Sequence, residues 1–419
     1  MTSAGPHRIG RGLGSPDRSQ PWAVRRRVSV RKLGLLATIG AGLAGLARLG
    51  FAVVPDAVAR ARNPVTRRPP YAASERARAL HERIEVVDLH ADSLLWGRDL
   101  LRRAPHSHVD VPRLIEGGIA LQGLAVCTKV PRRANLERND GRTDDVTLVA
   151  LVQRWPRSTW RSLLARALYH ADRAWAMAAE SDGRLTLVQS RADLEAYLAR
   201  RRADPAMTAA FLAIEGAHAL DGDPGAVDRL ADAGYRMMSP THFFDNEFGG
   251  SAHGVDKGGL TAAGRDMLAR MEDRSMLVDV AHASARTIDD VLSIATRPVV
   301  ASHTGIRASF DSVRNLADAH VRGIAATGGL IGIGFWPTAT GGRDAAAIAR
   351  AIRAAVELAG LDHVGLGSDF DGAVPVPFDA TGIVQLTDAL LVEGFADPEI
   401  AAIMGGNALR VLAGSLPPD

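Results

Sequence analysis

The chain has 419 residues, of which 47% are hydrophobic, and a formal net charge of only +3 at neutral pH. This length allows one large α/β domain or two ordinary ones, and the apolar content supports a substantial core. The near-balanced charge gives no reason to expect a nucleic-acid-binding surface. The single cysteine, Cys127, excludes an intramolecular disulfide framework and a cysteine-cluster metal site, so any metal must be bound by His, Asp and Glu.

The N-terminal region is predicted to lie outside the folded domain. Residues 1–32 are rich in Arg, Gly, Ser and Pro, which is typical of a disordered basic tail. Residues 33–55 form an apolar run about long enough to span a bilayer, although Arg48 interrupts it. Two interpretations stay open: an uncleaved membrane anchor, or an export signal cleaved near Ala57-Val58-Ala59. Both place the bulk of the chain outside the cytoplasm, after a linker at residues 56–74.

From residue 75 onward, short apolar runs alternate with amphipathic stretches, the pattern of repeated βα units around a parallel sheet. Eight runs are predicted strands: residues 86–92, 119–126, 209–215, 235–242, 276–282, 298–303, 329–336 and 363–369. Predicted helices include residues 261–272, 283–294, 345–358 and 381–393, and the largest insertion is expected at residues 131–200. The pattern favours a (β/α)8 TIM-type barrel with insertions over residues 75–415. An open doubly wound sheet is the alternative, but no G-x-G-x-x-G follows the first strand.

The first predicted strand carries a pair of residues that suits a divalent metal. The run VVDLHADSLL at residues 86–95 contains His90 and Asp92, which lie two positions apart and therefore share one face of a strand. Other predicted strands also end in a metal-competent or acid–base residue: Glu215, His282, His303 and Asp369. Barrel enzymes gather their active sites at these strand ends. The set is too large for one tetrahedral structural zinc and favours two metals that share a bridging carboxylate and a water.

The chain carries, in this order, the motifs DLHAD, AIEGAHAL, SPTHFFDNEFGG, LVDVAHAS, PVVASHTGIRASFDSVRNL and HVGLGSDFDG. They resemble the successive motifs of the membrane (renal) dipeptidase family, binuclear zinc peptidases of the amidohydrolase type. The resemblance implies that His90 and Asp92 bind one zinc ion. His282 and His303 would bind the second, and Glu215 would bridge the two ions.

The resemblance also implies roles for three residues beside the metals. His242 would stabilise the oxyanion, Arg314 would bind the C-terminal carboxylate of a dipeptide, and Asp369 would transfer the proton. These roles suit the side chains, because a guanidinium fork matches a carboxylate and an acid can move a proton from water to the leaving amine. The predicted function is zinc-dependent hydrolysis of dipeptides with a free C-terminal carboxylate, including C-terminal D-residues as the family implies. The resemblance is also compatible with a homodimer.

Alternatives to a zinc dipeptidase stay open at this point. The same metals could serve another amidohydrolase-type reaction, such as lactone hydrolysis, and the ligands would also accept cobalt or manganese. A membrane-tethered binding protein with a degenerate site is a third hypothesis. Near the motifs, Asp371 competes with Asp369 but is expected to cap a turn, and Asp88 is expected to be a satisfied core carboxylate. His218 is expected to be structural, His253 is expected to have no special role, and Cys127 is expected to be a small buried apolar residue.

Overall fold

The computed structural model of the chain describes residues 56–419. The predicted basic tail and the hydrophobic segment at residues 33–55 lie outside these described residues, and so do the interpretations that depend on them. Among the described residues, no helix is long and apolar enough to cross a membrane.

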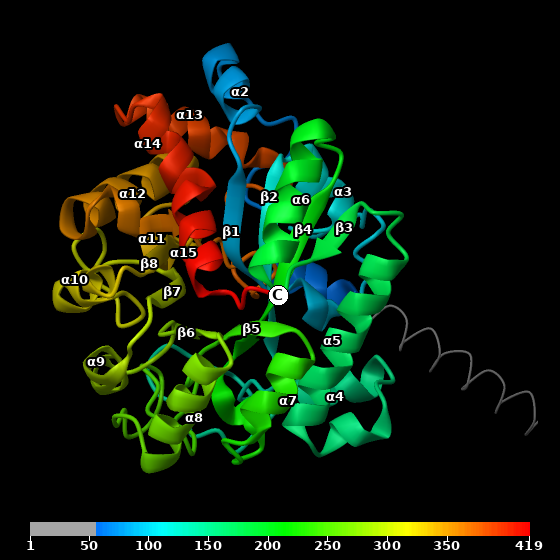
Figure 1. Cartoon of the computed structure of the whole chain (residues 1–419), viewed down its shortest axis with the longest axis vertical. Coiled ribbons are helices and arrows are strands. Elements are labelled where there is room, and N and C mark those ends of the chain that lie inside the picture. The colour runs from blue at the N-terminus through cyan, green and yellow to red at the C-terminus, as the bar shows by residue number, and fades with distance from the viewer. Residues whose placement is uncertain (1–55) are drawn as a thin grey trace, which may run out of the picture. The chain divides into compact units, whose positions relative to one another are not determined.

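A parallel sheet of nine strands forms the centre of this part of the chain (Figure 1). The strands are β1 (Val86–Ala91), β2 (Ile119–Cys127), β3 (Leu185–Leu187), β4 (Thr208–Glu215), β5 (Tyr235–Met238), β6 (Leu277–Asp279), β7 (Val299–Thr304), β8 (Leu330–Ile333) and β9 (Val364–Leu366). Strand β1 pairs with β2 and β9, and β2 also pairs with β4, so every strand except β3 belongs to a closed ring. The predicted (β/α)8 barrel is therefore confirmed, and the open doubly wound sheet is wrong.

Strand β3 is an addition to the barrel that the prediction left inside the insertion. It pairs with residues 208–210 of β4, whereas β5 pairs with residues 212–214 along the same edge of β4. The other edge of β4 pairs with β2 over residues 209–215. Strand β4 thus holds three neighbours, and this long strand carries Glu215 at its carboxyl end.

Several strands end earlier than predicted. The predicted strands at residues 235–242, 276–282, 329–336 and 363–369 are too long at their carboxyl ends, because β5 stops four residues sooner and β6, β8 and β9 stop three residues sooner. His282 and Asp369 have φ angles of 62° and 59°, which a β ladder does not accept. His242, His282 and Asp369 therefore lie on loops just beyond the strands.

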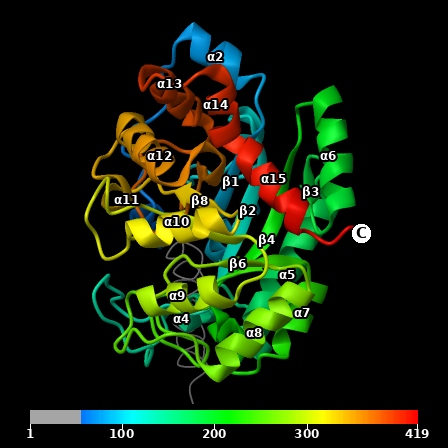
Figure 2. The same ribbon diagram turned by 60° about the vertical axis from the view of Figure 1, so that its left-hand side comes forward.

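Helices surround the barrel. They are α2 (Glu75–His81), α3 (Val111–Glu116), α4 (Asp145–Val152), α5 (Leu163–Ala179), α6 (Arg191–Ala203), α7 (Ala226–Asp232), α8 (Ala262–Asp273), α9 (Ala285–Ile294), α10 (Asp318–Ala326), α11 (Pro337–Thr340), α12 (Ala345–Ala359), α13 (Val384–Val392), α14 (Asp397–Ala401) and α15 (Asn407–Ser415). Short 3-10 turns are η1 (Ser93–Trp96), η2 (Arg157–Trp160), η3 (Ala217–Leu220), η4 (Leu361–His363) and η5 (Ala380–Gly382), and a π turn is η6 (Ala402–Gly406). In Figure 2, α5–α8 lie on one side of the strands and α10, α12 and α13 on the other.

Local sequence explains where many of these helices begin. The side chains of Ser162, Thr261 and Ser284 each accept a hydrogen bond from a backbone N–H in the first turn of α5, α8 and α9. Four predicted helices, at residues 261–272, 283–294, 345–358 and 381–393, correspond to α8, α9, α12 and α13. The predicted insertion at residues 131–200 contains α4, α5, β3 and most of α6.

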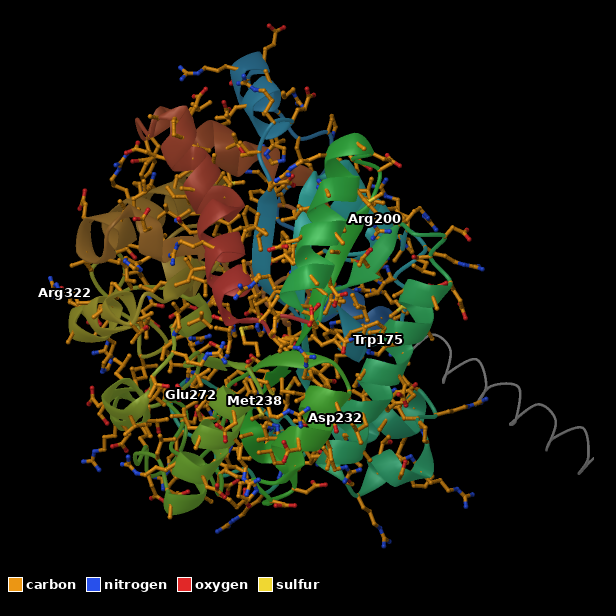
Figure 3. The ribbon with its side chains drawn as sticks, viewed as in Figure 1. Trp175, Arg200, Asp232, Met238, Glu272 and Arg322 are labelled. Carbon is orange, nitrogen blue, oxygen red and sulfur yellow. The ribbon has the colours of Figure 1, made fainter. Side chains whose placement is uncertain are left out.

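The barrel interior is a packed core, closed at the amino ends of the strands. Val87, Phe211 and Leu330 belong to one cluster of buried side chains with Val411 and Leu412 of α15. In Figure 3, Arg200 and Arg322 project from α6 and α10 at the surface, whereas Met238 lies inside. Because this end is filled by apolar side chains, a polar pocket can open only at the carboxyl ends.

The segment predicted as a linker has structure of its own. Residues 56–62 are helical, and Val65 forms an isolated parallel bridge with Val376. The Ser74 side chain then caps α2 by accepting a hydrogen bond from the backbone N–H of Ala77.

Candidate active site

A cavity of about 340 Å³ opens at the carboxyl ends of the strands. Its lining includes the predicted site residues Asp92, Glu215, His242, His282, Arg314 and Asp369. Hydrophobic side chains from η1 and α4, among them Leu95, Trp96 and Val149, also line it. The cavity therefore has a charged region beside apolar walls, as small-molecule sites commonly do.

Glu215 lies at the centre of the charged region. It ends β4, and only 4% of its surface is exposed. Its Oε1 lies 3.2 Å from His282 Nε2, 3.4 Å from His303 Nε2 and 3.6 Å from His90 Nε2. Its Oε2 lies 3.3 Å from Nε2 of His242. One carboxylate thus faces four imidazoles that come from four different strands or the loops after them.

The five predicted metal ligands form two groups with metal-like spacing, and both groups contain Glu215. One consists of His90, Asp92 and Glu215, and the other of Glu215, His282 and His303. All five side chains are buried. The structure therefore brings together the ligands that the motifs predicted, in the pairing that they implied.

Unsatisfied polar atoms show that these groups suit cations. His90 Nε2 and Asp92 Oδ1 are buried without a hydrogen-bond partner among the described residues. The Nε2 atoms of His282 and His303 lie 3.0 Å apart, within hydrogen-bond distance of each other. Imidazole nitrogens and carboxylate oxygens that converge in this way, two of them without partners, match a divalent metal site.

The charge balance of the region points to the same conclusion. Burial acts to lower the pKa of His90, but Asp92 and Glu215 outweigh it and raise this pKa to about 10. Burial, together with the neighbouring Asp92, raises the pKa of Glu215 well above its ordinary value. The carboxylates are thus in excess, and bound cations would relieve this imbalance.

Ser302 and Asp279, which the sequence analysis did not single out, support the imidazoles of His90 and His303. Ser302 Oγ donates a 2.6 Å hydrogen bond to Asp279 Oδ2 and lies 2.9 Å from His303 Nδ1. It also lies 3.3 Å from Nδ1 of His90. Backbone N–H groups of Ala281 and Ser302 donate to Asp279 Oδ1. Their positions beside His282 and His303, in VDVAHAS and VVASH, were the available signal.

His242 has a neighbour that the sequence did not indicate. Its Nδ1 lies 3.3 Å from the sulfur of Cys127, which also lines the cavity. The same sulfur lies 3.6 Å from the carbonyl of Lys129, to which the thiol donates. Burial raises the pKa of Cys127, so the thiol stays protonated. Cys127 is thus buried at the end of β2 and also contacts the imidazole of His242.

Arg314 and Asp369 complete the predicted set. Arg314 Nη2 donates a 2.7 Å hydrogen bond to the carbonyl of His303, and its guanidinium lies 5.5 Å from the ring centre of Trp336. Burial raises the pKa of Asp369 to about 8. A Cβ added at Gly372 would lie 1.8 Å from Asp369 Oδ1, so the loop needs glycine there to leave this carboxylate room.

Asp371, the competitor of Asp369, is bound within the protein. Its Oδ2 accepts hydrogen bonds of 2.7 Å from both Arg98 and Ser93, and its Oδ1 accepts 2.9 Å from the backbone N–H of His108. Burial acts to raise the pKa of Asp371, but Arg98 and His108 outweigh it and lower this pKa to about 2. Asp371 therefore fastens the β9 loop to η1 and the segment that follows.

The remaining candidates are Asp88, His218 and His253. Asp88 accepts hydrogen bonds from Ser368 and Gln122, as expected of a satisfied core carboxylate. Burial lowers the pKa of His218 to about 3, which keeps it neutral, and it belongs to neither metal group among the described residues. The ring centre of His253 lies 5.2 Å from that of His282.

Comparisons with known proteins agree with this geometry. Residues 74–415 match the model of the membrane dipeptidase family, peptidase family M19. An uncharacterized Klebsiella pneumoniae protein from the pqqA 5′ region is 35% identical over 250 residues, covering 56% of this chain and 90% of that protein.

Solved structures show the same fold. A dipeptidase AC, a metallopeptidase of family M19, superposes with a TM-score of 0.66 at 25% identity, covering 80% of this chain and 99% of the other. A Rhodobacter sphaeroides metallopeptidase liganded with a phosphinate mimic of the dipeptide L-Ala-D-Ala gives a TM-score of 0.64 at 24% identity, with coverages of 80% and 99%. The chain therefore belongs to the membrane dipeptidase family and is a dipeptidase of the metallopeptidase class.

Proposed function

We propose that the chain is a binuclear zinc dipeptidase that cleaves dipeptides with a free C-terminal carboxylate. The observation that carries this proposal is the position of Glu215, which lies within metal-binding spacing of His90 and Asp92 and also of His282 and His303. His90 and Asp92 would hold one zinc ion and His282 and His303 the other, and Glu215 would contribute to both groups. The ions would supply Lewis-acid chemistry, which lowers the pKa of a bound water and polarises a carbonyl.

The other site residues orient the substrate and move the proton. Arg314 pairs with the terminal carboxylate, because only Nη2 of its guanidinium is hydrogen-bonded within the described residues and the remaining donors face a cavity. His242 donates from Nε2 to the carbonyl oxygen as negative charge develops there. Asp369 accepts the proton of the attacking water and returns it to the leaving amine, a role that a pKa of about 8 suits near neutral pH.

The first test is metal analysis of the purified full chain, for which we expect close to two zinc ions per chain. The same preparation should hydrolyse L-Ala-D-Ala, the dipeptide whose mimic is bound in the Rhodobacter sphaeroides neighbour. A chain that binds two metals but hydrolyses no dipeptide would instead support another amidohydrolase-type reaction. A chain that binds no metal would overturn both.

The second test addresses the carboxylate. We compare each dipeptide with its C-terminal amide, which lacks only the negative charge. The wild type should prefer the acid, and Arg314→Gln should lose about 10²-fold in kcat/KM on the acid and little on the amide. Arg322→Gln is the control, since Arg322 projects from α10 at the surface and does not line the cavity. Equal losses on acid and amide would contradict the assignment of Arg314.

We also propose that the enzyme acts outside the cytoplasm, attached or exported through residues 33–55. The support is the length and apolar character of that run and the basic residues before it. N-terminal sequencing of the mature protein distinguishes the two routes. An intact N-terminus in the membrane fraction indicates an anchor, and a new N-terminus near residue 59 indicates a cleaved signal. An intact N-terminus in the cytosol would contradict both.

A further inference from the structure

The active-site cavity has a wall that does not belong to the family domain. The match to the family model begins at residue 74. Val58 and Arg62 nevertheless line the same cavity as Glu215, His242 and Asp369. The segment at residues 56–63 therefore contributes surface to the site from outside the part of the chain that the family shares.

Hydrogen bonds fix this segment to the loop that carries Asp369. Asn63, which is only 7% exposed, accepts a 2.8 Å hydrogen bond on Oδ1 from the backbone N–H of Ala373. Its Nδ2 donates to the carbonyl of Ala59, at 3.0 Å, and Ala59 is only 3% exposed. The carbonyl of Asn63 lies 3.1 Å from Nε2 of His108. A residue with three such contacts holds the helical stretch at residues 56–62 in place.

Contacts on either side of Asn63 hold the segment at both of its ends. Upstream, Asp56 Oδ1 lies 2.8 Å from Nε2 of His106. Downstream, the backbone N–H of Thr66 donates to the carbonyl of Val376 at 2.9 Å, and the N–H of Val376 donates to the carbonyl of Pro64 at 3.2 Å. These contacts hold the segment in place as one wall of the cavity.

The charges that line the cavity leave two arginines without partners. Arg62 on this wall and Arg133, on the loop after β2, form no ion pair within residues 56–419. Two of the lining acids have arginine partners: Asp371 pairs with Arg98 at 2.7 Å and Asp145 with Arg132 at 3.2 Å. In the proposed function, Asp92 and Glu215 would bind the metals and Asp369 would transfer the proton. Among the described residues, the acids that line the cavity therefore do not pair with Arg62 or Arg133.

We propose that Arg62, together with Arg133, selects dipeptides that carry a second anionic group besides the terminal carboxylate. The inference rests on the proposed function, in which Arg314 already binds that carboxylate. A dipeptide with an acidic side chain places a second carboxylate near the mouth, where the two guanidinium groups favour it over a neutral amide. For partly exposed charges, each arginine favours the acidic substrate by about two- to fivefold.

The test compares isosteric substrates on the zinc-loaded full chain. We measure kcat/KM for Ala-Glu against Ala-Gln and for Glu-Ala against Gln-Ala, so that only the charge differs within each pair. The wild type should prefer the acid in at least one pair, and Arg62→Gln should reduce that preference by about two- to fivefold. Arg62→Lys should retain it, and Arg62→Gln combined with Arg133→Gln should bring the ratio close to one.

Arg60→Gln is the matched control. Arg60 belongs to the same helical stretch, is exposed and does not line the cavity, yet its substitution changes the net charge equally. If Arg60→Gln lowers the ratio as much as Arg62→Gln, or if the wild-type ratio is one in both pairs, the inference is overturned. In either case, hydrolysis of neutral dipeptides would leave the proposed function intact. Absence of hydrolysis of every dipeptide would overturn the proposed function itself.

Discussion

Two clusters of buried charge lie side by side in this enzyme, and they are built differently. Around Asp371, each carboxylate oxygen has hydrogen-bond donors at 2.7 to 2.9 Å from Arg98, Ser93 and the backbone. Around Glu215, the neighbouring Nε2 atoms stand 3.2 to 3.6 Å away, and polar atoms of His90 and Asp92 have no partner among the described residues. The first cluster is complete within the protein, whereas the second leaves polar atoms of His90 and Asp92 without partners among the described residues.

The difference explains why Asp369 and Asp371, two positions apart on one loop, serve different purposes. Burial raises the pKa of Asp369 to about 8, while Arg98 and His108 outweigh burial and lower the pKa of Asp371 to about 2. A buried charge with all its partners stabilises a structure, and one without them marks a place for chemistry. Sequence spacing alone does not separate the two cases.

The largest expected effect comes from the centre of the incomplete cluster. Glu215→Gln removes the charge that both metal groups share and should lower kcat by at least about 10³-fold. Metal content should fall below two zinc ions per chain. Inductively coupled plasma analysis alongside dipeptide kinetics checks both, with the exposed Glu195→Gln as the control. Full metal content in Glu215→Gln would contradict the bridging role.

Asp369→Asn should lower kcat by about 10²- to 10⁴-fold, because a positioned acid–base group contributes on this scale. The thermal midpoint should stay at or above that of the wild type, since a neutral isostere no longer suffers the desolvation of a buried carboxylate. Steady-state kinetics and calorimetry on one preparation check the pair of results. A large loss of stability would place Asp369 in the structural class with Asp371.

Asp371→Asn should show the opposite pattern. It leaves Arg98 buried without its partner, which costs about 3–5 kcal/mol of unfolding free energy. The folded fraction should still bind zinc, because no metal ligand is altered. Denaturant titration gives the stability, and zinc content of the native fraction gives the second reading. An unchanged midpoint would show that the network around Asp371 is dispensable.

The pH dependence of stability sharpens the same point. The pKa of Asp371 is lowered from 3.8 to about 2 in the folded chain. Its carboxylate therefore stabilises the fold fully above pH 3.8, and this contribution is lost as the pH falls through 2. Two pKa units correspond to about 2–3 kcal/mol. The unfolding free energy of the wild type and of Asp371→Asn is measured across this pH range, and the difference between the two isolates this contribution. A difference that does not change with pH would refute the assignment.

The smallest expected effect comes from Ser302, which contacts two of the proposed metal ligands. Ser302→Ala removes the hydroxyl between Asp279 and the two imidazoles of His90 and His303 and should weaken zinc binding by about 10- to 100-fold. Competition with a chelator measures the affinity, and Ser293→Ala on α9 serves as the exposed control. An unaltered affinity would mean that the histidines are oriented by their strands alone.

The barrel and the residue types of the candidate site could be predicted from the sequence. Parallel strands buried on both faces read as short apolar runs, so β1, β2, β4 and β7 are visible without any tertiary contact. The types of the proposed ligands follow from the residues at the strand ends. The order of the motifs then indicated the roles proposed for His242 and Arg314, which periodicity could not.

Only the tertiary structure decided which of the charged residues lack partners. The distinction between Asp369 and Asp371 depends on Arg98 and His108, which lie more than 260 positions away along the chain. The contact of Cys127 with His242 and the wall formed by residues 56–63 likewise join distant segments. Burial and hydrogen bonding are set by such long-range contacts, whereas local patterns report only the elements that bring the residues there.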